Sequence, residues 1–372
     1  MLPRHLYVHV PFCTRRCSYC DFSIAVRRVA PVSDYVGAVR AELQLRVPGN
    51  ERWDIDTLYL GGGTPSRLGP DGVARLLEAI RGRVSLAPDA EVTLEVNPED
   101  ATVEAAIAWR AAGVNRVSLG TQSFDDRALA WMRRTHDVAC ALNAVEAVRT
   151  AGIDNVSLDL IFALPTMLER SWESDLERAL ALAPSHVSVY GLTVEHATPL
   201  GRWVERGEIA EPPEERYEVE FLRAHDVMTA AGFEHYEVSN FARPGRRSRH
   251  NWAYWSGAAY AGVGPAAHGF DGAQRRWNVA PYEQWRRRLR QGEDPVAGME
   301  ALTDENRVTE SVYLGLRTAA GLRLSGEEVT SVRPWIQAGW ATVEDGARLV
   351  LRAPGWLRLD AFTRFLTAAR SL

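Results

Sequence analysis

The sequence has few cysteines, no long apolar run and no large excess of charge. It holds four cysteines in 372 residues and carries a net charge of −5. No apolar run approaches the roughly 18 residues that span a bilayer, and the N-terminus lacks the charged and apolar regions of a secretory signal. We therefore expect a cytoplasmic protein, in a reducing compartment where thiolates stay available. Peripheral contact with a membrane and a homodimer are left open.

The even charge balance gives no reason to expect a nucleic-acid partner. Arginine gathers only locally, at residues 246–249 and 286–288. Such short stretches are typical of a solvated loop and a solvated helix face. We expect the partners to be small molecules and proteins.

Three of the four cysteines form one short motif, C-x3-C-x2-C, at Cys13, Cys17 and Cys20. Thiolates select zinc or iron–sulfur clusters. A structural zinc site usually has four protein ligands, whereas three cysteines leave one corner open, which suits a [4Fe–4S] cluster. Zinc with His9 as the fourth ligand is an alternative, and a disulfide would leave one cysteine unpaired. Cys140 lies in an alanine-rich helical run and is expected to be a small buried residue.

Strand and helix patterns alternate six times before residue 200, which indicates a parallel sheet. The predicted strands are 7–10, 57–60, 91–96, 115–119, 155–161 and 185–190, and the predicted helices are 35–45, 70–83, 102–112, 125–150 with a break near 136, and 171–182. A complete eight-fold barrel takes about 250 residues. We therefore predict an α/β fold, a partial (β/α)6 barrel over residues 1–200.

Two further segments follow the barrel. Residues 201–300 are predicted to extend it, with a helix at 212–230 and the stretch H-N-x-x-Y-W at 250–255. Residues 301–372 read as a smaller α+β unit with a winged-helix appearance: helices 305–318 and 327–338, a hairpin at 341–351 and a final helix to 372.

Residues suited to binding follow or end the predicted strands. In barrels of parallel strands, the active site lies at the carboxyl ends of the strands. A glycine turn there lets the backbone approach a ligand closely, and a buried carboxylate needs a partner. The residues at these strand ends are Gly62, Gly63, Thr64, Glu95, Gln122 and Asp159.

The cysteine motif resembles that of the radical S-adenosylmethionine (SAM) enzymes, and the surrounding Y-x-H-x-P-F-C is similar to the coproporphyrinogen oxidase and HemW branch. The resemblance implies a [4Fe–4S] cluster on the three cysteines. The fourth iron of this cluster, which has no cysteine ligand, would bind SAM beside the glycine turn. It implies that Tyr7 and Tyr19 flank this SAM and that Glu95 contacts it. Gln122, Arg134 and Asp159 match positions that hold a second SAM in the oxidase, so one or two SAM molecules are left open.

The stretch His250-Asn-x-x-Tyr-Trp resembles the signature of HemW heme chaperones. Imidazole is a common axial ligand of heme iron, so the resemblance implies that His250 binds heme for transfer to acceptor hemoproteins, while His268 contacts SAM. Two alternatives are left open: a hydrogen-bonded His250 with the aromatics filling core, and an oxygen-independent coproporphyrinogen III oxidase. Against the oxidase, Phe22 stands where its pattern has a fourth cysteine, and only six residues precede Tyr7.

Overall fold

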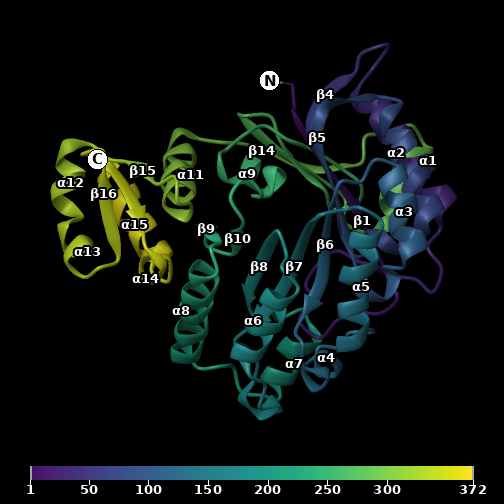
Figure 1. The fold of residues 1–372 in the computed structure, drawn as a ribbon. Coiled ribbons are helices and arrows are strands. Elements are labelled where there is room, and N and C mark those ends of the chain that lie inside the picture. The colour runs from purple at the N-terminus through teal and green to yellow at the C-terminus, as the bar shows by residue number, and fades with distance from the viewer. Residues whose placement is uncertain (1, 371–372) are drawn as a thin grey trace.

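A nine-stranded sheet forms the centre of the computed structural model, which describes residues 2–370 (Figure 1). Its strands lie in the order β11-β1-β4-β5-β6-β7-β8-β10-β9. The six neighbours from β1 to β8 are all parallel. The bounds are β1 His5–Val10, β4 Trp53–Gly62, β5 Val84–Val96, β6 Arg116–Gln122, β7 Asn155–Phe162, β8 His186–Gly191, β9 Glu234–Glu237, β10 Asn240–Ala242 and β11 Ala261–Val263.

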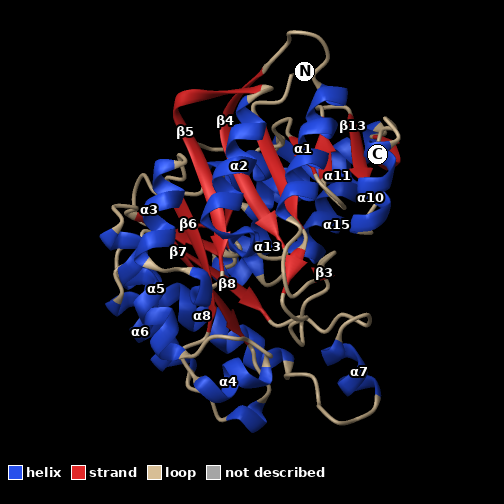
Figure 2. Ribbon diagram, turned by 90° about the vertical axis from the view of Figure 1, so that its right-hand side faces the viewer, coloured by secondary structure: helices blue, strands red, loops and turns tan. Residues whose placement is uncertain are grey.

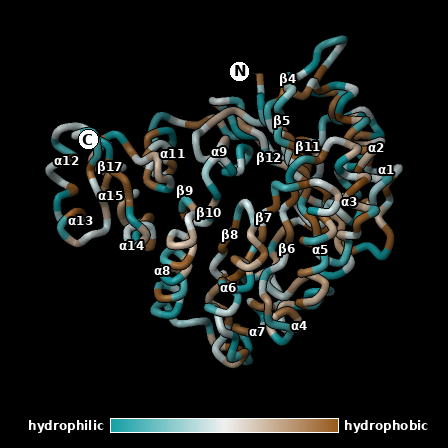
Figure 3. The backbone as a smooth tube through the Cα atoms, viewed as in Figure 1, coloured by the Kyte–Doolittle hydropathy of each residue, from teal (hydrophilic) through white to brown (hydrophobic). Residues whose placement is uncertain are grey.

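Helices lie along the outer side of the parallel strands (Figure 2), and the apolar side chains of both form one core. Successive side chains of a strand point to opposite faces, so Val92 and Leu94 of β5 join the apolar core while Glu95 lines an interior cavity. Hydrophobic stretches accordingly recur along these strands and helices (Figure 3). The helices are α1 Val32–Arg46, α2 Gly69–Arg81, α3 Val103–Ala111, α4 Asp126–Trp131, α5 Val138–Thr150, α6 Trp172–Ala181, α7 Pro199–Glu205 and α8 Glu214–Ala230.

The predicted partial barrel is confirmed, including the break between α4 and α5. Strands β4 and β5 begin earlier than predicted, since their first residues pair with each other beyond the apolar segment. The predicted helix 327–338 is two helices, and Pro334 stands at the start of the second. Cys140 was expected to be buried, but it is partly exposed on α5.

Residues 201–300 extend the sheet at both edges. β10 pairs antiparallel with β8, and β11 pairs parallel with β1. These strands and a separate antiparallel sheet were not predicted, because most of them have only three or four residues, too few to show a period. The further elements are α9 Arg249–Trp255, β12 His268–Phe270, β13 Gln274–Asn278, α10 Tyr282–Arg290 and β14 Val296–Ala301, while β2 Phe12–Cys13 and β3 Ala25–Val26 form a short pair beside the barrel.

Residues 304–370 form a three-stranded sheet with helices, set beside β9 and α9 (Figure 1). The predicted hairpin is β16 with β17, and the last two residues of the predicted final helix lie outside the described residues. Among residues 2–370, no helix combines the length and apolar character that crossing a bilayer requires. The elements are α11 Asp304–Arg317, β15 Leu322–Arg323, α12 Gly326–Ser331, α13 Arg333–Gln337, β16 Ala341–Glu344, β17 Arg348–Leu351, α14 Ala353–Trp356 and α15 Leu359–Arg370.

Glu42 ties α1 to the segment that follows β11. Its carboxylate is fully buried and accepts hydrogen bonds from Gly264 N (2.9 Å), Trp285 Nε1 (2.8 Å) and Asn278 Nδ2 (2.7 Å), beside the guanidinium of Arg46. A buried ion pair that loses one partner leaves an uncompensated charge. The barrel wall next to β1 therefore depends on this carboxylate.

We expect Glu42→Ala to lower the free energy of unfolding by about 3–5 kcal/mol, because Arg46 and three donors lose their partner. Urea unfolding followed by circular dichroism measures the change. Glu78→Ala, at an exposed position of α2, is the matched control and should change the stability by no more than about 0.5 kcal/mol. Equal stability of the two variants would contradict the role of Glu42.

Candidate functional site

A cavity of about 430 Å³, here called the cysteine cavity, lies at the carboxyl ends of the parallel strands. It brings together most of the residues singled out from the sequence, although they come from six separate stretches of the chain. The predicted residues that line it are Cys13, Cys17, Tyr19, Cys20, Gly62, Gly63, Thr64, Glu95, Gln122, Arg134 and Asp159.

The three cysteines of the motif are free and partly exposed. Cys13 Sγ lies 3.4 Å from Thr64 Oγ1. Burial raises the pKa of the Cys13 thiol, and it raises the pKa of Cys20 to about 11. A bound metal group deprotonates such thiols by coordination, so the site suits a group that supplies positive charge.

A single zinc ion has no support among residues 2–370, where no three His, Cys, Asp or Glu side chains converge on one ion position. His9, the alternative fourth ligand, has both ring nitrogens in hydrogen bonds, Nδ1 with Tyr7 Oη (3.1 Å) and Nε2 with the Ser23 carbonyl (2.9 Å). A four-iron cluster instead takes each thiolate on a separate iron. All three cysteines line the same cavity, as a shared cluster requires.

The glycine turn after β4 is shaped by Glu95. Its Oε2 accepts a hydrogen bond from Gly62 N (3.0 Å), and its Oε1 accepts one from Tyr59 Oη (2.8 Å). Gly62 has φ of 115°, where a side chain is strained, and a Cβ there would lie 2.6 Å from the His9 ring. A Cβ at Gly63 would lie 2.7 Å from Pro11. The turn therefore requires glycine for its own packing as well as for the approach of a ligand.

Arg134 anchors the loop that carries Cys17. Its guanidinium donates to Asn97 Oδ1 (2.7 Å), to the Gly120 carbonyl (2.9 Å) and to Cys17 Sγ (3.6 Å). Burial acts to lower the pKa of Arg134, but Tyr19 and Cys17 outweigh it and raise that pKa. The fixed cation stands beside Cys17 Sγ, where it would stabilise a thiolate.

Gln122 and Asp159 also line the cysteine cavity. Gln122 adopts a left-handed φ of 66°, which costs a non-glycine residue energy and marks a constrained position. Asp159 accepts hydrogen bonds from Ser118 Oγ (3.1 and 3.2 Å), and burial raises its pKa. The cysteine cavity thus has an amide and a carboxyl side chain in its lining in addition to the thiols.

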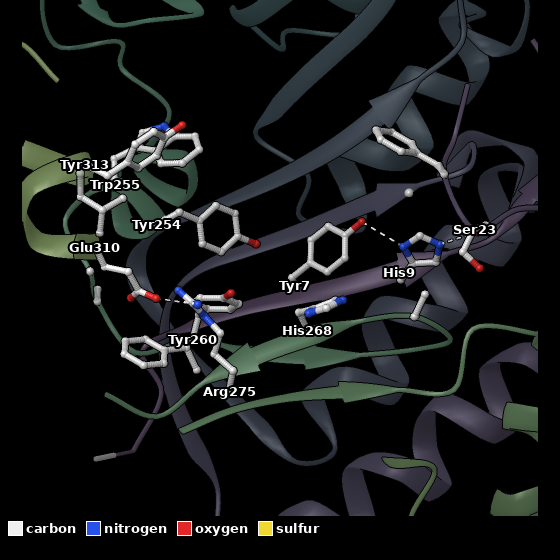
Figure 4. A pocket seen from close by; sticks show the side chains of 17 residues that line it. Tyr7, His9, Ser23, Tyr254, Trp255, Tyr260, His268, Arg275, Glu310 and Tyr313 are labelled. Atoms are coloured by element: carbon white, nitrogen blue, oxygen red, sulfur yellow. Dashed lines mark hydrogen bonds and ion pairs between the residues drawn. The ribbon is translucent and has the colours of Figure 1, made fainter. Parts of the chain in front are cut away.

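A second cavity of about 570 Å³, here called the aromatic cavity, adjoins the first and shares Phe22 and Gly62 with it. Figure 4 shows Tyr7 and His268 near its middle, with His9 and Ser23 at one end and Arg275 and Glu310 at the other. Most of its remaining wall is aromatic or apolar: Tyr254, Trp255, Ala258, Tyr260, Ala266, Phe270, Tyr313 and Leu314.

Tyr7 and His268 line the aromatic cavity and are not among the residues that line the cysteine cavity. The resemblance had implied that both residues contact SAM. Tyr7 donates to His9 Nδ1, because His9 Nε2 must donate to a carbonyl. His268 is exposed and stacks on Trp277 with ring centroids 5.9 Å apart. Neither ring nitrogen of His268 has a hydrogen-bond partner among residues 2–370. Burial lowers the pKa of His268, which favours the neutral imidazole.

His250 lines neither cavity, and its side chain fixes α9 in the barrel. Nδ1 is hydrogen-bonded to Thr57 Oγ1 (2.7 Å) and Nε2 to Tyr254 Oη (2.8 Å), with 1 % of the residue exposed. The Glu91 carboxylate accepts from the backbone N–H groups of Arg249 and His250. Burial lowers the pKa of His250 to about 3. In this structure His250 has no free nitrogen for a metal, and it positions Tyr254 and Trp255 in the aromatic cavity.

Sequence reasoning missed Tyr260, Arg275, Glu310 and Tyr313. They come from β13, α11 and the stretch before β11, and no motif joins them. The only signal was their aromatic or charged character, which many surface residues share. Their meeting depends on how the C-terminal unit packs beside α9.

Comparison with known proteins agrees with this geometry. Residues 7–179 match the Radical SAM superfamily. The chain is 41 % identical over 374 residues to heme chaperone HemW of Mycobacterium tuberculosis (strain ATCC 25618 / H37Rv), covering 98 % of this chain and 95 % of that protein. It is 34 % identical over 317 residues to heme chaperone HemW of Bacillus subtilis (strain 168), covering 85 % and 84 %.

The chain belongs to the HemW family of the radical SAM superfamily. Among solved structures, coproporphyrinogen III oxidase (HemN) from Escherichia coli matches with a TM-score of 0.81 and 23 % identity, covering 98 % of this chain and 89 % of that one. At that identity the match shows the fold alone, which is the radical SAM type of partial barrel. Membership of the HemW family brings an expected [4Fe–4S] cluster and SAM, for which the cysteine cavity supplies thiols, a glycine turn and polar groups.

We expect Cys13→Ser, Cys17→Ser and Cys20→Ser each to remove most iron and sulfide from anaerobically reconstituted protein, because a hydroxyl does not replace a thiolate on iron. Iron and sulfide analysis with the absorbance near 400 nm measures the loss. Cys140→Ser is the control, since α5 holds that thiol away from the cavity lining. Full iron content in Cys17→Ser would refute the assignment.

Burial raises the pKa of Glu95 from 4.5 to about 7, against the hydrogen bond from Tyr59 that lowers it. Between these values the folded state binds more protons than the unfolded state, so the free energy of unfolding falls as the pH rises. Urea unfolding at several pH values should show wild type losing up to about 1.4 kcal/mol per pH unit relative to Glu95→Gln across this window. Parallel curves for the two proteins would contradict the shift.

Proposed function

We propose that this protein is a heme chaperone that binds heme in the aromatic cavity and passes it to acceptor hemoproteins. A [4Fe–4S] cluster on Cys13, Cys17 and Cys20 and SAM occupy the adjoining cysteine cavity. The names of the relatives support this function. The observation that carries it is an aromatic cavity of about 570 Å³, with an unbonded imidazole, directly beside the cysteines. Binding cavities for flat organic ligands have this size and lining.

We assign the axial heme ligand to His268, in place of the His250 that the sequence motif suggested. A neutral imidazole with a free ring nitrogen is the form that binds heme iron. His268 offers one inside the cavity, whereas His250 would have to give up its bonds to Thr57 and Tyr254. The H-N-x-x-Y-W motif then acts by placing its aromatic residues in the cavity wall.

The test is heme titration of His268→Ala, in which the Soret band should shift and the affinity should fall at least about tenfold, the equivalent of 1.4 kcal/mol. Cluster iron should be unchanged. His196→Ala is the control, because that imidazole is exposed and paired with Glu205. His250→Gln should lower stability but leave the Soret band of the folded fraction in place. An intact spectrum in His268→Ala with loss in folded His250→Gln would reverse the assignment.

The shared border of the two cavities also fits a radical enzyme that acts on a porphyrinogen, the oxygen-independent coproporphyrinogen III oxidase reaction. Phe22 and Gly62 line both cavities, so a ligand in one lies close to a ligand in the other. Anaerobic incubation with coproporphyrinogen, SAM and a reductant distinguishes the two functions. The chaperone function predicts that the protein binds heme and does not decarboxylate coproporphyrinogen. Decarboxylation by a protein that does not bind heme would establish the oxidase.

A further inference from the structure

Arg275 and Glu310 are the only arginine and acidic residues in the lining of the aromatic cavity. Arg275 Nη1 lies 2.6 Å from Glu310 Oε1, and the guanidinium stands 5.8 Å from the centre of the Phe270 ring. Figure 4 shows the pair at the end of the cavity away from His9. A cavity whose wall is mostly aromatic or apolar therefore has one guanidinium at its end, and this guanidinium is already paired with a carboxylate.

The pair joins two parts of the chain and is open to exchange. Arg275 belongs to β13, whereas Glu310 belongs to α11, the first helix of the C-terminal unit. The two side chains are 38 % and 26 % exposed. Ion pairs exposed to this degree stabilise a protein by roughly 0–1 kcal/mol. A carboxylate on an incoming ligand can thus replace Glu310 at little cost.

We propose that Arg275 recognises the carboxylate of the ligand that fills the aromatic cavity, and that Glu310 is an internal stand-in for that carboxylate until the ligand arrives. The guanidinium fork binds carboxylates through two parallel hydrogen bonds. The ligand class is a flat apolar molecule with an acidic side chain. This rests on the proposed function for the identity of that molecule, a porphyrin with its propionates.

The experiment compares the binding of metal-free protoporphyrin IX, which has two carboxylates, with that of its dimethyl ester, which has none. Without a metal, axial ligation does not contribute. Arg275→Gln should weaken binding of the diacid about tenfold, the value of a charged hydrogen bond, and leave the ester within about twofold. Glu310→Gln should strengthen the diacid several-fold, because the competing carboxylate is gone, and leave the ester unchanged.

The matched control is Arg276→Gln. Arg276 is the next residue of β13, pairs with Asp294 at 2.7 Å and lies outside the aromatic cavity. It should bind both porphyrins like the wild type. Equal diacid affinity in the Arg275 and Arg276 variants, or weaker binding in Glu310→Gln, would overturn the inference while the heme site stands. If Arg275→Gln does not fold, the diacid affinity of Glu310→Gln decides whether the inference stands. Wild-type protein that binds heme but neither metal-free porphyrin would overturn the inference, and wild-type protein that binds none of the three would overturn the proposed function itself.

Discussion

The turn at Gly62 is held between Glu95 and His9, and both cavities depend on it. Glu95 fixes the turn through the Gly62 N–H, and His9 packs so closely that no side chain fits between them. His9 is in turn fixed by Tyr7 and Ser23. Gly62 lines both cavities. A shift of this one turn would change the lining of the cysteine cavity and of the aromatic cavity together.

The second constraint is the position of α9, which His250 fixes against the barrel. A helix of seven residues has little stability of its own. This one is held by the hydrogen bond between His250 and Thr57 of the barrel strand β4, and by the Glu91 carboxylate at its first N–H groups. Burying an imidazole is favourable only when its nitrogens have partners. The fixed helix keeps Tyr254 and Trp255 in the wall of the aromatic cavity.

Local motifs predicted the cysteine cavity well, because its residues follow strand ends and parallel strands bring those ends to one edge. That Tyr7 lines the aromatic cavity could not be predicted, because strand alternation gives the face of a side chain but not the cavity beside it. Its contact with SAM stays a prediction. The aromatic cavity was beyond reach, because Arg275 and Glu310 meet only through tertiary packing. The positions of His250 and His268 in the sequence do not show which imidazole is buried. Burial decides which of the two has a ring nitrogen without a hydrogen-bond partner.

The most direct test of the two-cavity account is iron-edge anomalous diffraction from crystals of the cluster-loaded protein with bound heme. The account predicts one iron peak among Cys13, Cys17 and Cys20 and a second, separate peak in the aromatic cavity within bonding distance of a ring nitrogen of His268. The shared lining at Gly62 requires the two peaks to lie in adjoining cavities. A heme iron peak beside His250, or anywhere outside the aromatic cavity, would contradict it.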